Sequence, residues 1–326
     1  MLQFETCVTN VSRSDEEWIV TSCYLPTQEI HTEKYDAVFV CNGHYSIPEV
    51  PKFPGLEVFK KNKPDDVVIH TVKYRSPLHY NDKIVLIIGG GPSAQDISID
   101  IASEAKLVYI SHHVNVLLSV KFPDNIVHKP DIEYFTEDGA VFTDGSSSHI
   151  DRVLLATGYR YNLDFLDDSC GVWVEDYGYV TPLYKQLINI SQPTMAFIGL
   201  PFRTFIFPLF ETQVKCMIKI LSGKVSLPDR GEMYKDRRKE EENGKSKGIP
   251  KRKYHNLASR VRQYMNELYE LGKLEPLEEV IFGIYEKTMA LRKIDLVDYR
   301  NHKFRIKDSE SFEVFHVGQS VGKTQC

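Results

Sequence analysis

The sequence contains, at residues 84–94, the run Ile84-Val85-Leu86-Ile87-Ile88-Gly89-Gly90-Gly91-Pro92-Ser93-Ala94. Five consecutive aliphatic residues are typical of a parallel strand that is covered on both faces. The loop after them has the spacing G-x-G-x-x-A of a dinucleotide-binding turn. Gly89 would allow the tight turn, Gly91 would let the backbone approach a pyrophosphate, and Ala94 would let a helix pack close to the strand. The run therefore predicts the start of a nucleotide-binding α/β domain.

The residues after this loop continue the same pattern. Pro92 suits the first turn of a helix, where its missing N–H is no loss. We expect the helix to run to residue 102, with Ile97 and Ile101 on one side, and a second strand to follow at residues 107–110. The free N–H groups at the start of such a helix can bind a diphosphate. A glycine-rich turn in an unrelated α/β domain is the alternative interpretation.

The end of the second strand bears on which dinucleotide would bind. An Asp or Glu there would bind the ribose hydroxyls of NAD, or those of S-adenosylmethionine, but the sequence has Ser111-His112-His113. Because no carboxylate stands at this strand end to repel a 2′-phosphate, NADP is favoured. The serine hydroxyl and the imidazoles of His112 and His113 are candidate phosphate partners. Alternatively, His112 and His113 are ordinary surface histidines that bind no ligand.

Three more strands are expected to end at a glycine. The strand at residues 35–41 leads to Asn42-Gly43-His44, the strand at 152–155 to Ala156-Thr157-Gly158-Tyr159, and the strand at 196–198 to Gly199. The carboxyl ends of strands are where an α/β sheet places ligand groups, although an ordinary tight turn explains Gly43 equally well. A helix from Pro208 to Leu221 would follow and carry Gln213.

The rest of the chain predicts supporting elements. Hairpins are expected around Ser12–Asp15 and over residues 132–142. The apolar spacing of residues 257–271 predicts an amphipathic helix that packs on a domain. The mixed charge run at 229–253 is most simply a solvated helix face or a loop.

Composition limits the class of protein. The chain has 326 residues, of which 42% are hydrophobic and 26% charged, as expected for compact globular domains. A formal charge of −5 and a pI near 6.1 give no broad basic field, so nucleic acid is not an expected partner.

The cysteines and the apolar segments bear on location. The six cysteines lie far apart without a Cys-x-x-Cys pair, so we expect reduced, buried thiols, Cys41 among them, and no metal site. The first residues lack the pattern of a signal peptide, and no segment reaches the ~20 apolar residues that span a bilayer. A cytoplasmic location is therefore expected.

Four motifs together resemble a known family. They are Val40–His44, Gly89–Ala94, Leu155–Tyr159 and Phe197–Leu200, and they recur in the order found in flavin-containing monooxygenases, as does Pro182–Lys185. Within that family the chain is similar to the shorter insect-type forms that resemble alkaloid N-oxygenases.

The fingerprint F-x-G-x-x-x-H-x-x-x-Y/F of this family is partly present. His70 and Tyr74 supply its second half, and tyrosine in last place favours the N- and S-oxygenating group over the Baeyer–Villiger group. The first half is altered, because Lys61 stands where glycine is expected. The resemblance implies that this motif shapes the hinge between two domains.

The resemblance also implies a fold and a reaction. It predicts two dinucleotide-binding, Rossmann-like domains, with an NADP domain at residues 81–155 inserted between the two parts of an FAD domain, 1–80 and 156–326. Using FAD and NADPH, the protein would transfer oxygen from O2 to a small nitrogen or sulfur nucleophile, and no charged catalytic triad is expected. The residues expected to bind FAD are Asn42, Gly43, His44, Thr157, Gly158, Gly199 and Gln213.

The sequence also departs from the family pattern. The family begins with a βαβ unit that binds FAD through G-x-G-x-x-G, and on the order of 100 residues of this kind are missing before Met1. His112 or His113 replaces the family's arginine. A fragment, a mispredicted gene product and a truncated isoform are all consistent with this. Because the helix N-terminus that would hold the flavin diphosphate is missing, we expect the chain to bind FAD weakly, to self-associate and to be inactive without this unit.

Two other functions stay open at this point. One is another paired-nucleotide flavoprotein, such as a disulfide reductase relative, which the missing Cys-x-x-Cys disfavours. The other is a non-catalytic nucleotide-binding protein derived from the enzyme. The substrate cannot be identified from the sequence.

Overall fold

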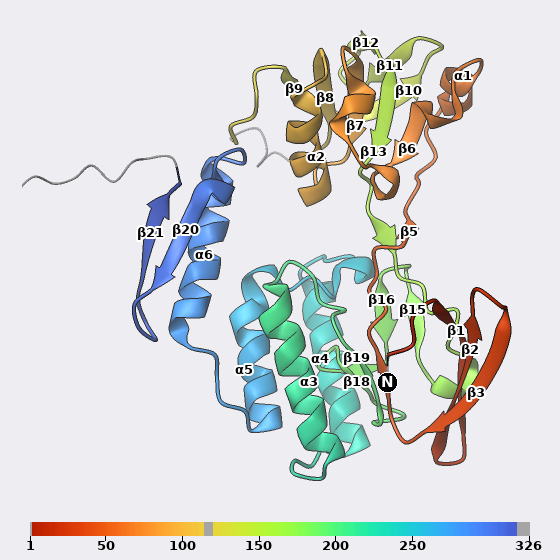
Figure 1. The fold of residues 1–326 in the computed structure, drawn as a ribbon, viewed down its shortest axis with the longest axis vertical. Helices are drawn as coiled ribbons and strands as arrows, with labels where there is room; N and C mark the ends of the chain where they lie inside the picture. Colours follow the sequence, from red (N-terminus) through yellow and green to blue (C-terminus); the bar gives the residue numbers. More distant parts are fainter. Residues whose placement is uncertain (1, 114–119, 318–326) are drawn as a thin grey trace, which may run out of the picture. The chain divides into compact units, whose positions relative to one another are not determined.

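A computed structural model of the chain describes residues 2–113 and 120–317 (Figure 1). The chain divides into two compact units. The first unit comprises Met1–Ile47 and Arg160–Pro276, and the second comprises Pro48–Tyr159 and Leu277–Cys326. The predicted mixed α/β class is confirmed.

The second unit is built on a five-stranded sheet of order β6-β13-β7-β8-β9, in which all neighbouring strands are parallel. The predicted strand–loop–helix–strand unit is confirmed, because α2 (Pro92–Ala102) connects β7 to β8. Its strands are β6 (Val68–His70), β7 (Ile84–Ile88), β8 (Leu107–Ser111), β9 (Ile126–Lys129) and β13 (Arg152–Leu155).

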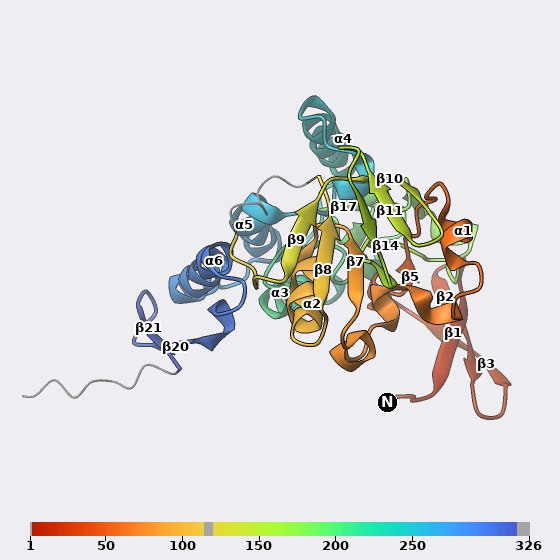
Figure 2. The ribbon, with the colours of Figure 1, turned by 90° about the horizontal axis from the view of Figure 1, so that it is seen from above.

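Both faces of this sheet are covered, which explains the unbroken aliphatic run of β7. Val85 and Ile87 pack in one apolar cluster with Ile101 of α2, whereas Leu86 and Ile88 pack in another with residues of β10 and β11. Figure 2 shows α2 on one side of these strands, with β10 and β11 on the other. The second layer is an antiparallel sheet of β10 (Ile132–Phe135), β11 (Gly139–Phe142) and β12 (Ser147–His149). Short helices complete this part: α1 (Leu56–Lys60), η1 (Asp65–Val67), η2 (Thr71–Lys73) and η3 (Pro77–Tyr80).

The C-terminal segment belongs to the same unit. It contains α6 (Glu279–Ile294), η8 (Tyr299–Asn301), β20 (His302–Ile306) and β21 (Phe312–His316). A parallel bridge between Lys121 and Asp295 and ion pairs of Arg292 and Arg300 with Asp96 of α2 attach it. The sequence placed this segment with residues 156–276; the structure groups it with α2 instead, through contacts that have no local sequence signal.

The first unit contains several small sheets. β1 (Thr6–Ser14), β2 (Glu17–Tyr24) and β3 (Glu29–Tyr35) form an antiparallel sheet, which includes the predicted hairpin. A second sheet has the order β17 (Leu183–Tyr184), β18 (Ile188–Asn189), β19 (Met195–Phe197) and β4 (Val38–Val40). β15 (Trp173–Glu175) pairs with β16 (Tyr179–Thr181), and η5 (Asp168–Cys170) precedes them. The chain passes between units at β5 (Ile47–Pro48) and β14 (Tyr159–Arg160), which pair with each other.

Three longer helices complete the first unit: α3 (Ile206–Leu221), α4 (Arg230–Ser246) and α5 (Val261–Gly272), with η6 (Lys251–Lys253) and η7 (Ala258–Arg260) between the last two. The predicted amphipathic helix is confirmed by α5, which buries Met265 and Leu268. The charge run forms α4, whose first turn is capped by the Asp229 carboxylate, accepting from the Glu232 N–H at 2.9 Å.

Two further observations concern the cysteines and the length of the apolar helices. The prediction of buried cysteines is confirmed for Cys170 and Cys216 but wrong for Cys7 and Cys41, whose side chains are exposed; Cys41 lies just after β4, which ends at Val40. No helix within residues 2–113 and 120–317 is both long and apolar enough to cross a membrane.

Candidate functional site

The glycine-rich loop follows β7 at the carboxyl edge of the second unit's sheet. Gly89 has φ +125°, and a Cβ atom there would lie 2.4 Å from the Ala156 carbonyl oxygen. Only glycine therefore fits this close approach to the strand end of β13. At Gly91, by contrast, a Cβ atom would meet no atom of the described residues within 4 Å, so the backbone is open to a ligand on this side. The Gln95 side chain donates to the Gly90 carbonyl at 3.1 Å and fixes the loop from α2.

The start of α2 suits an anionic ligand. Gly91 is its N-cap and supplies no side-chain acceptor, and the first turn contains no acidic residue. The first N–H groups of a helix have no partner within the helix, and the helix dipole makes this end positive. A diphosphate fits here, because it can approach the backbone at Gly91 and accept from these N–H groups.

The next strand end separates the two predicted histidines. His112 is buried, and its Nε2 lies 2.7 Å from Nδ1 of His128 on β9. Burial lowers the pKa of His112, and the charges of His128 and His113 would lower it further. His113 is exposed, and its Nδ1 lies 3.4 Å from the carboxylate of Asp131. Of the two imidazoles, His113 is the one that can reach a ligand from solvent.

Asp131 corrects the expectation that this strand end is free of carboxylates. β8 and β9 are parallel neighbours, with Ser111 paired to Lys129, so the residues after both strands come to the same edge. A carboxylate contributed by the neighbouring strand cannot be seen from the local sequence after β8.

Two arginines at α2 were also missed by the sequence interpretation. Nη2 of Arg292 lies 3.0 Å from the Gln95 side-chain oxygen and 3.3 Å from the Asp96 carboxylate. Arg300 contacts the other oxygen of Asp96 at 3.1 Å. Positive charge is thereby brought from the C-terminal segment to the first turns of α2. These contacts join residues far apart in the sequence, and no motif marks them.

Further predicted residues lie in the same unit. His70 ends β6, which pairs with β13, and its ring meets that of Tyr159 edge to face at 5.0 Å. Burial lowers the pKa of His70, while the backbone of Gly158 opposes that shift. Gly158 has φ +90° and open space where a Cβ atom would lie. The Thr157 hydroxyl donates to the Glu49 carbonyl, so it holds the backbone rather than facing outwards.

The structure therefore groups Thr157 and Gly158 with the Gly89–Ala94 loop, in the second unit. The sequence had assigned them to the other nucleotide. Tyr74, the last residue of the fingerprint, donates from its hydroxyl to the Asp100 carboxylate of α2 at 2.5 Å. This bond ties the fingerprint segment to the helix that follows the glycine loop.

The first unit has its own strand-end site. β4 and β19 are parallel neighbours, with Val40 paired to Phe197, so Gly43 and Gly199 lie at one edge. Gly43 has φ +70° and open space beside it, and Asn42 is exposed. The sheet thus joins two motifs that are distant in the sequence.

His44 has an unusual environment at this edge. Both ring nitrogens are buried and have no hydrogen-bond partner among the described residues. The ring stacks on that of Tyr161, with centroids 4.5 Å apart, and burial lowers the pKa of His44 to about 4. A buried polar group without a partner is costly, and in native proteins a ligand, an ordered water or strain usually accounts for it.

Gln213 has a different environment. Its side-chain oxygen accepts from the Gly199 N–H at 2.9 Å, and its nitrogen donates to the Tyr264 hydroxyl at 2.9 Å. The side chain is fully buried, so it positions the Gly199 turn. At Gly199, φ is +84°, and a Cβ atom would lie 2.5 Å from the tip of the Phe210 ring, so the backbone conformation and the packing both disfavour a side chain.

The chain is similar to known oxygenases and monooxygenases over most of its length. The chain is 29% identical over 320 residues to senecionine N-oxygenase of Tyria jacobaeae, covering 96% of this chain and 68% of that protein. It is 35% identical to flavin-containing monooxygenase FMO GS-OX-like 3 of Arabidopsis thaliana, over 82% of this chain and 60% of that protein. The structure of S-allyl-L-cysteine S-oxygenase from Allium sativum superposes with a TM-score of 0.82 at 34% identity, covering 91% of this chain and 67% of that one.

The chain thus spans 60% to 68% of the length of these relatives. The family model for flavin-binding monooxygenase-like proteins matches residues 1–120 and 115–292, which include all the predicted nucleotide-binding residues. On the match to this model and the identity to these relatives, the chain belongs to the flavin-binding monooxygenase-like family.

Proposed function

We propose that the chain acts in the NADPH- and O2-dependent oxygenation of a small nitrogen or sulfur nucleophile. The family uses FAD and NADPH, and the relatives named above include one N-oxygenase and one S-oxygenase. When both cofactors are bound, they supply the redox chemistry, and the protein binds and orients them. We therefore assign residues of the chain according to the cofactor that each would bind.

The observation that carries the proposal is the open backbone at Gly91, at the N-terminus of α2. The Gly89–Ala94 loop would hold the diphosphate of NADPH through backbone N–H groups. His113 would contact the 2′-phosphate. Arg292 and Arg300 would add positive charge beside the loop, partly offset by Asp96.

The flavin would be held by the strand-end site of the first unit. Gly43 allows close approach of the backbone, and Gln213 fixes the Gly199 turn. A ring nitrogen of His44, which has no partner within residues 2–113 and 120–317, would donate one hydrogen bond to the flavin or accept one from it. Its burial beside Tyr161 keeps the imidazole neutral near pH 7 and keeps water away from it. The assignment of Thr157 and Gly158 to FAD stays a prediction from the sequence, because both residues lie in the second unit.

We also propose a cytoplasmic location. The five cysteines within residues 2–113 and 120–317 are free thiols, as expected in a reducing compartment such as the cytoplasm. Light scattering of the purified chain would show whether it forms an oligomer.

The test is a product assay under ¹⁸O2. The purified chain is supplied with FAD and NADPH and with a tertiary amine or a thioether, and the product is analysed by mass spectrometry. An N-oxide or S-oxide carrying ¹⁸O supports the proposal. Saturable NADPH binding without oxygenated product would instead support the non-catalytic nucleotide-binding protein.

A further inference from the structure

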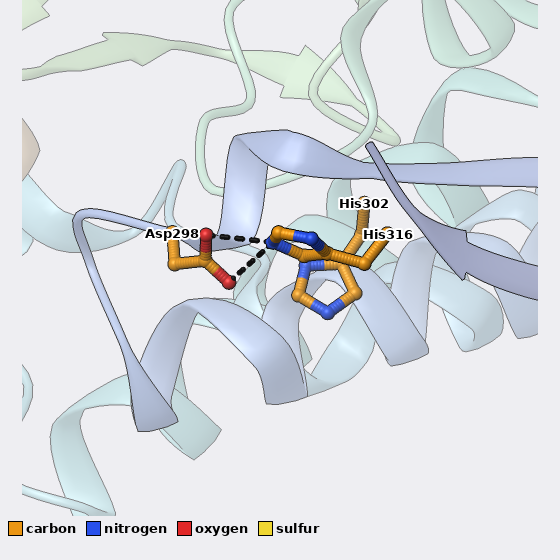
Figure 3. Close-up of side chains that lie close together, drawn as sticks. All are labelled: Asp298, His302 and His316. Carbon is orange, nitrogen blue, oxygen red and sulfur yellow. Dashed lines mark hydrogen bonds and ion pairs between the residues drawn. The ribbon is translucent and has the colours of Figure 1, made fainter. Parts of the chain in front are cut away.

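Three side chains with metal-binding atoms meet at one end of the C-terminal hairpin. Asp298 lies just before η8, His302 is the first residue of β20, and His316 is the last residue of β21. His302 and His316 are directly opposite each other in the register of the two strands. Figure 3 shows the Asp298 carboxylate directed at the His316 ring, with the His302 ring beside it.

The distances within this cluster are short. Nε2 of His316 lies 2.7 and 2.8 Å from the two carboxylate oxygens of Asp298. One ligand atom from each of the three residues lies within 4.8 Å of the other two. The carboxylate is held in place, because the Asn301 amide donates to it at 3.0 Å.

The cluster also has polar atoms that its own hydrogen bonds do not satisfy. Nδ1 of His302 and Nδ1 of His316 are both buried and have no hydrogen-bond partner among the described residues. The two imidazole centroids are 5.0 Å apart, with the rings nearly perpendicular at 81°. An ion pair between Asp298 and His316 explains why these two side chains are in contact, but it does not explain why His302 lies beside them.

We propose that Asp298, His302 and His316 form a binding site for a divalent transition metal of the zinc class. Two imidazoles and one carboxylate are a donor set that such ions prefer, and three protein ligands leave a fourth position for water. In a tetrahedral site, neighbouring ligand atoms are roughly 3.3 Å apart. Since no two ligand atoms here are more than 4.8 Å apart, side-chain movements that shorten these distances by about 1.5 Å or less would bring all three atoms to one ion.

This inference revises the expectation of no metal site. The ligands are separated by three and then thirteen intervening residues, which is not the spacing of a recognised zinc motif, and only the hairpin brings them together. The family match ends at residue 292, before the first ligand. The site does not depend on the proposed function. A bound ion would join the start of η8 to both strands of the hairpin.

The test uses the full chain after treatment with EDTA. We expect Zn²⁺ to bind with a stoichiometry of one per chain in calorimetry, and Co²⁺ to give the visible absorption of a four-coordinate site. Asp298→Asn, His302→Gln and His316→Gln should each weaken Zn²⁺ binding at least tenfold. His149→Gln is the matched control, because His149 also lies 3.2 Å from a carboxylate, that of Asp151, but belongs to no cluster of three metal-binding side chains among the described residues.

The informative variant is His302→Gln, because it leaves the Asp298–His316 pair in place. Its circular dichroism and thermal midpoint without metal should match those of the wild type, so that a loss of metal binding reports on the site itself. Absence of saturable one-to-one binding in the wild type would overturn the proposal. Binding that persists in all three cluster variants, or that is lost equally in His149→Gln, would overturn it as well.

Discussion

The strand-end glycines of the two units look alike in the sequence but have different reasons to be glycine. In the second unit, Gly91 has an ordinary φ of −76°, and no described residue lies where its side chain would be. In the first unit, Gly199 has φ +84°, and the Phe210 ring occupies the space where its side chain would be. One position leaves room for a ligand and the other is closed by packing. A glycine near a strand end can therefore serve the approach of a ligand, as proposed for Gly91, or a close packing contact, as at Gly199.

The largest expected effect is at the closed position. Gly199→Val should lower the free energy of unfolding by about 3 kcal/mol, because a Cβ atom would clash with Phe210 and the backbone would be strained at positive φ. Urea unfolding followed by circular dichroism measures this. Stability equal to that of the wild type would show that position 199, like position 91, has room for a side chain.

Histidines at the two edges provide a second comparison. Among the described residues, neither ring nitrogen of His44 has a hydrogen-bond partner, and its pKa is lowered to about 4, whereas His112 is paired with His128. Because the folded pKa of His44 is below the unfolded value of about 6.5, the unfolded state takes up the proton first as pH falls. This group should therefore remove about 2 kcal/mol of stability between pH 7 and pH 5.

His44→Phe keeps a ring to stack on Tyr161 and removes the titrating group. Its unfolding free energy should fall less between pH 7 and pH 5 than that of the wild type, measured without added nucleotide. His31→Phe, on the exposed strand β3, is the control and should keep the wild-type pH dependence. An unchanged slope in His44→Phe would contradict the assignment.

At the open position, the expected change is in binding. Gly91→Val should weaken NADPH binding at least tenfold, about 1.4 kcal/mol, because a side chain would fill the space a diphosphate must enter. Stability should change little, since valine readily adopts this backbone conformation. Calorimetric titration with NADPH measures the affinity, and an unchanged value would reject the assigned loop.

The smallest effect should come from Asp131. Asp131→Asn removes an exposed carboxylate beside His113, and we expect the preference for NADPH over NADH to rise about threefold at low salt. Asp124→Asn is the control, because Asp124 precedes β9 and so lies at the other end of that strand. Competitive titrations with both nucleotides check this. Equal shifts in the two variants would assign the effect to overall charge.

The sequence by itself determined the local elements of the second unit. The aliphatic run, Gly89–Ala94 and the helix after it were predicted correctly, because a buried parallel strand and a tight turn each require residue types that stand together in the chain. The family followed from the order of the short motifs. Expectations about NADP and FAD binding at individual residues remain predictions.

Only the tertiary structure decided which residues meet across the chain. The parallel register of β8 and β9 brings Asp131 to His113, and the packing of the C-terminal segment brings Arg292 and Arg300 to α2. Burial at His44 and the fit of Gly199 against Phe210 likewise depend on neighbours from distant segments. Such contacts are set by sheet register and side-chain packing, and these depend on the whole fold rather than on any local run of residues.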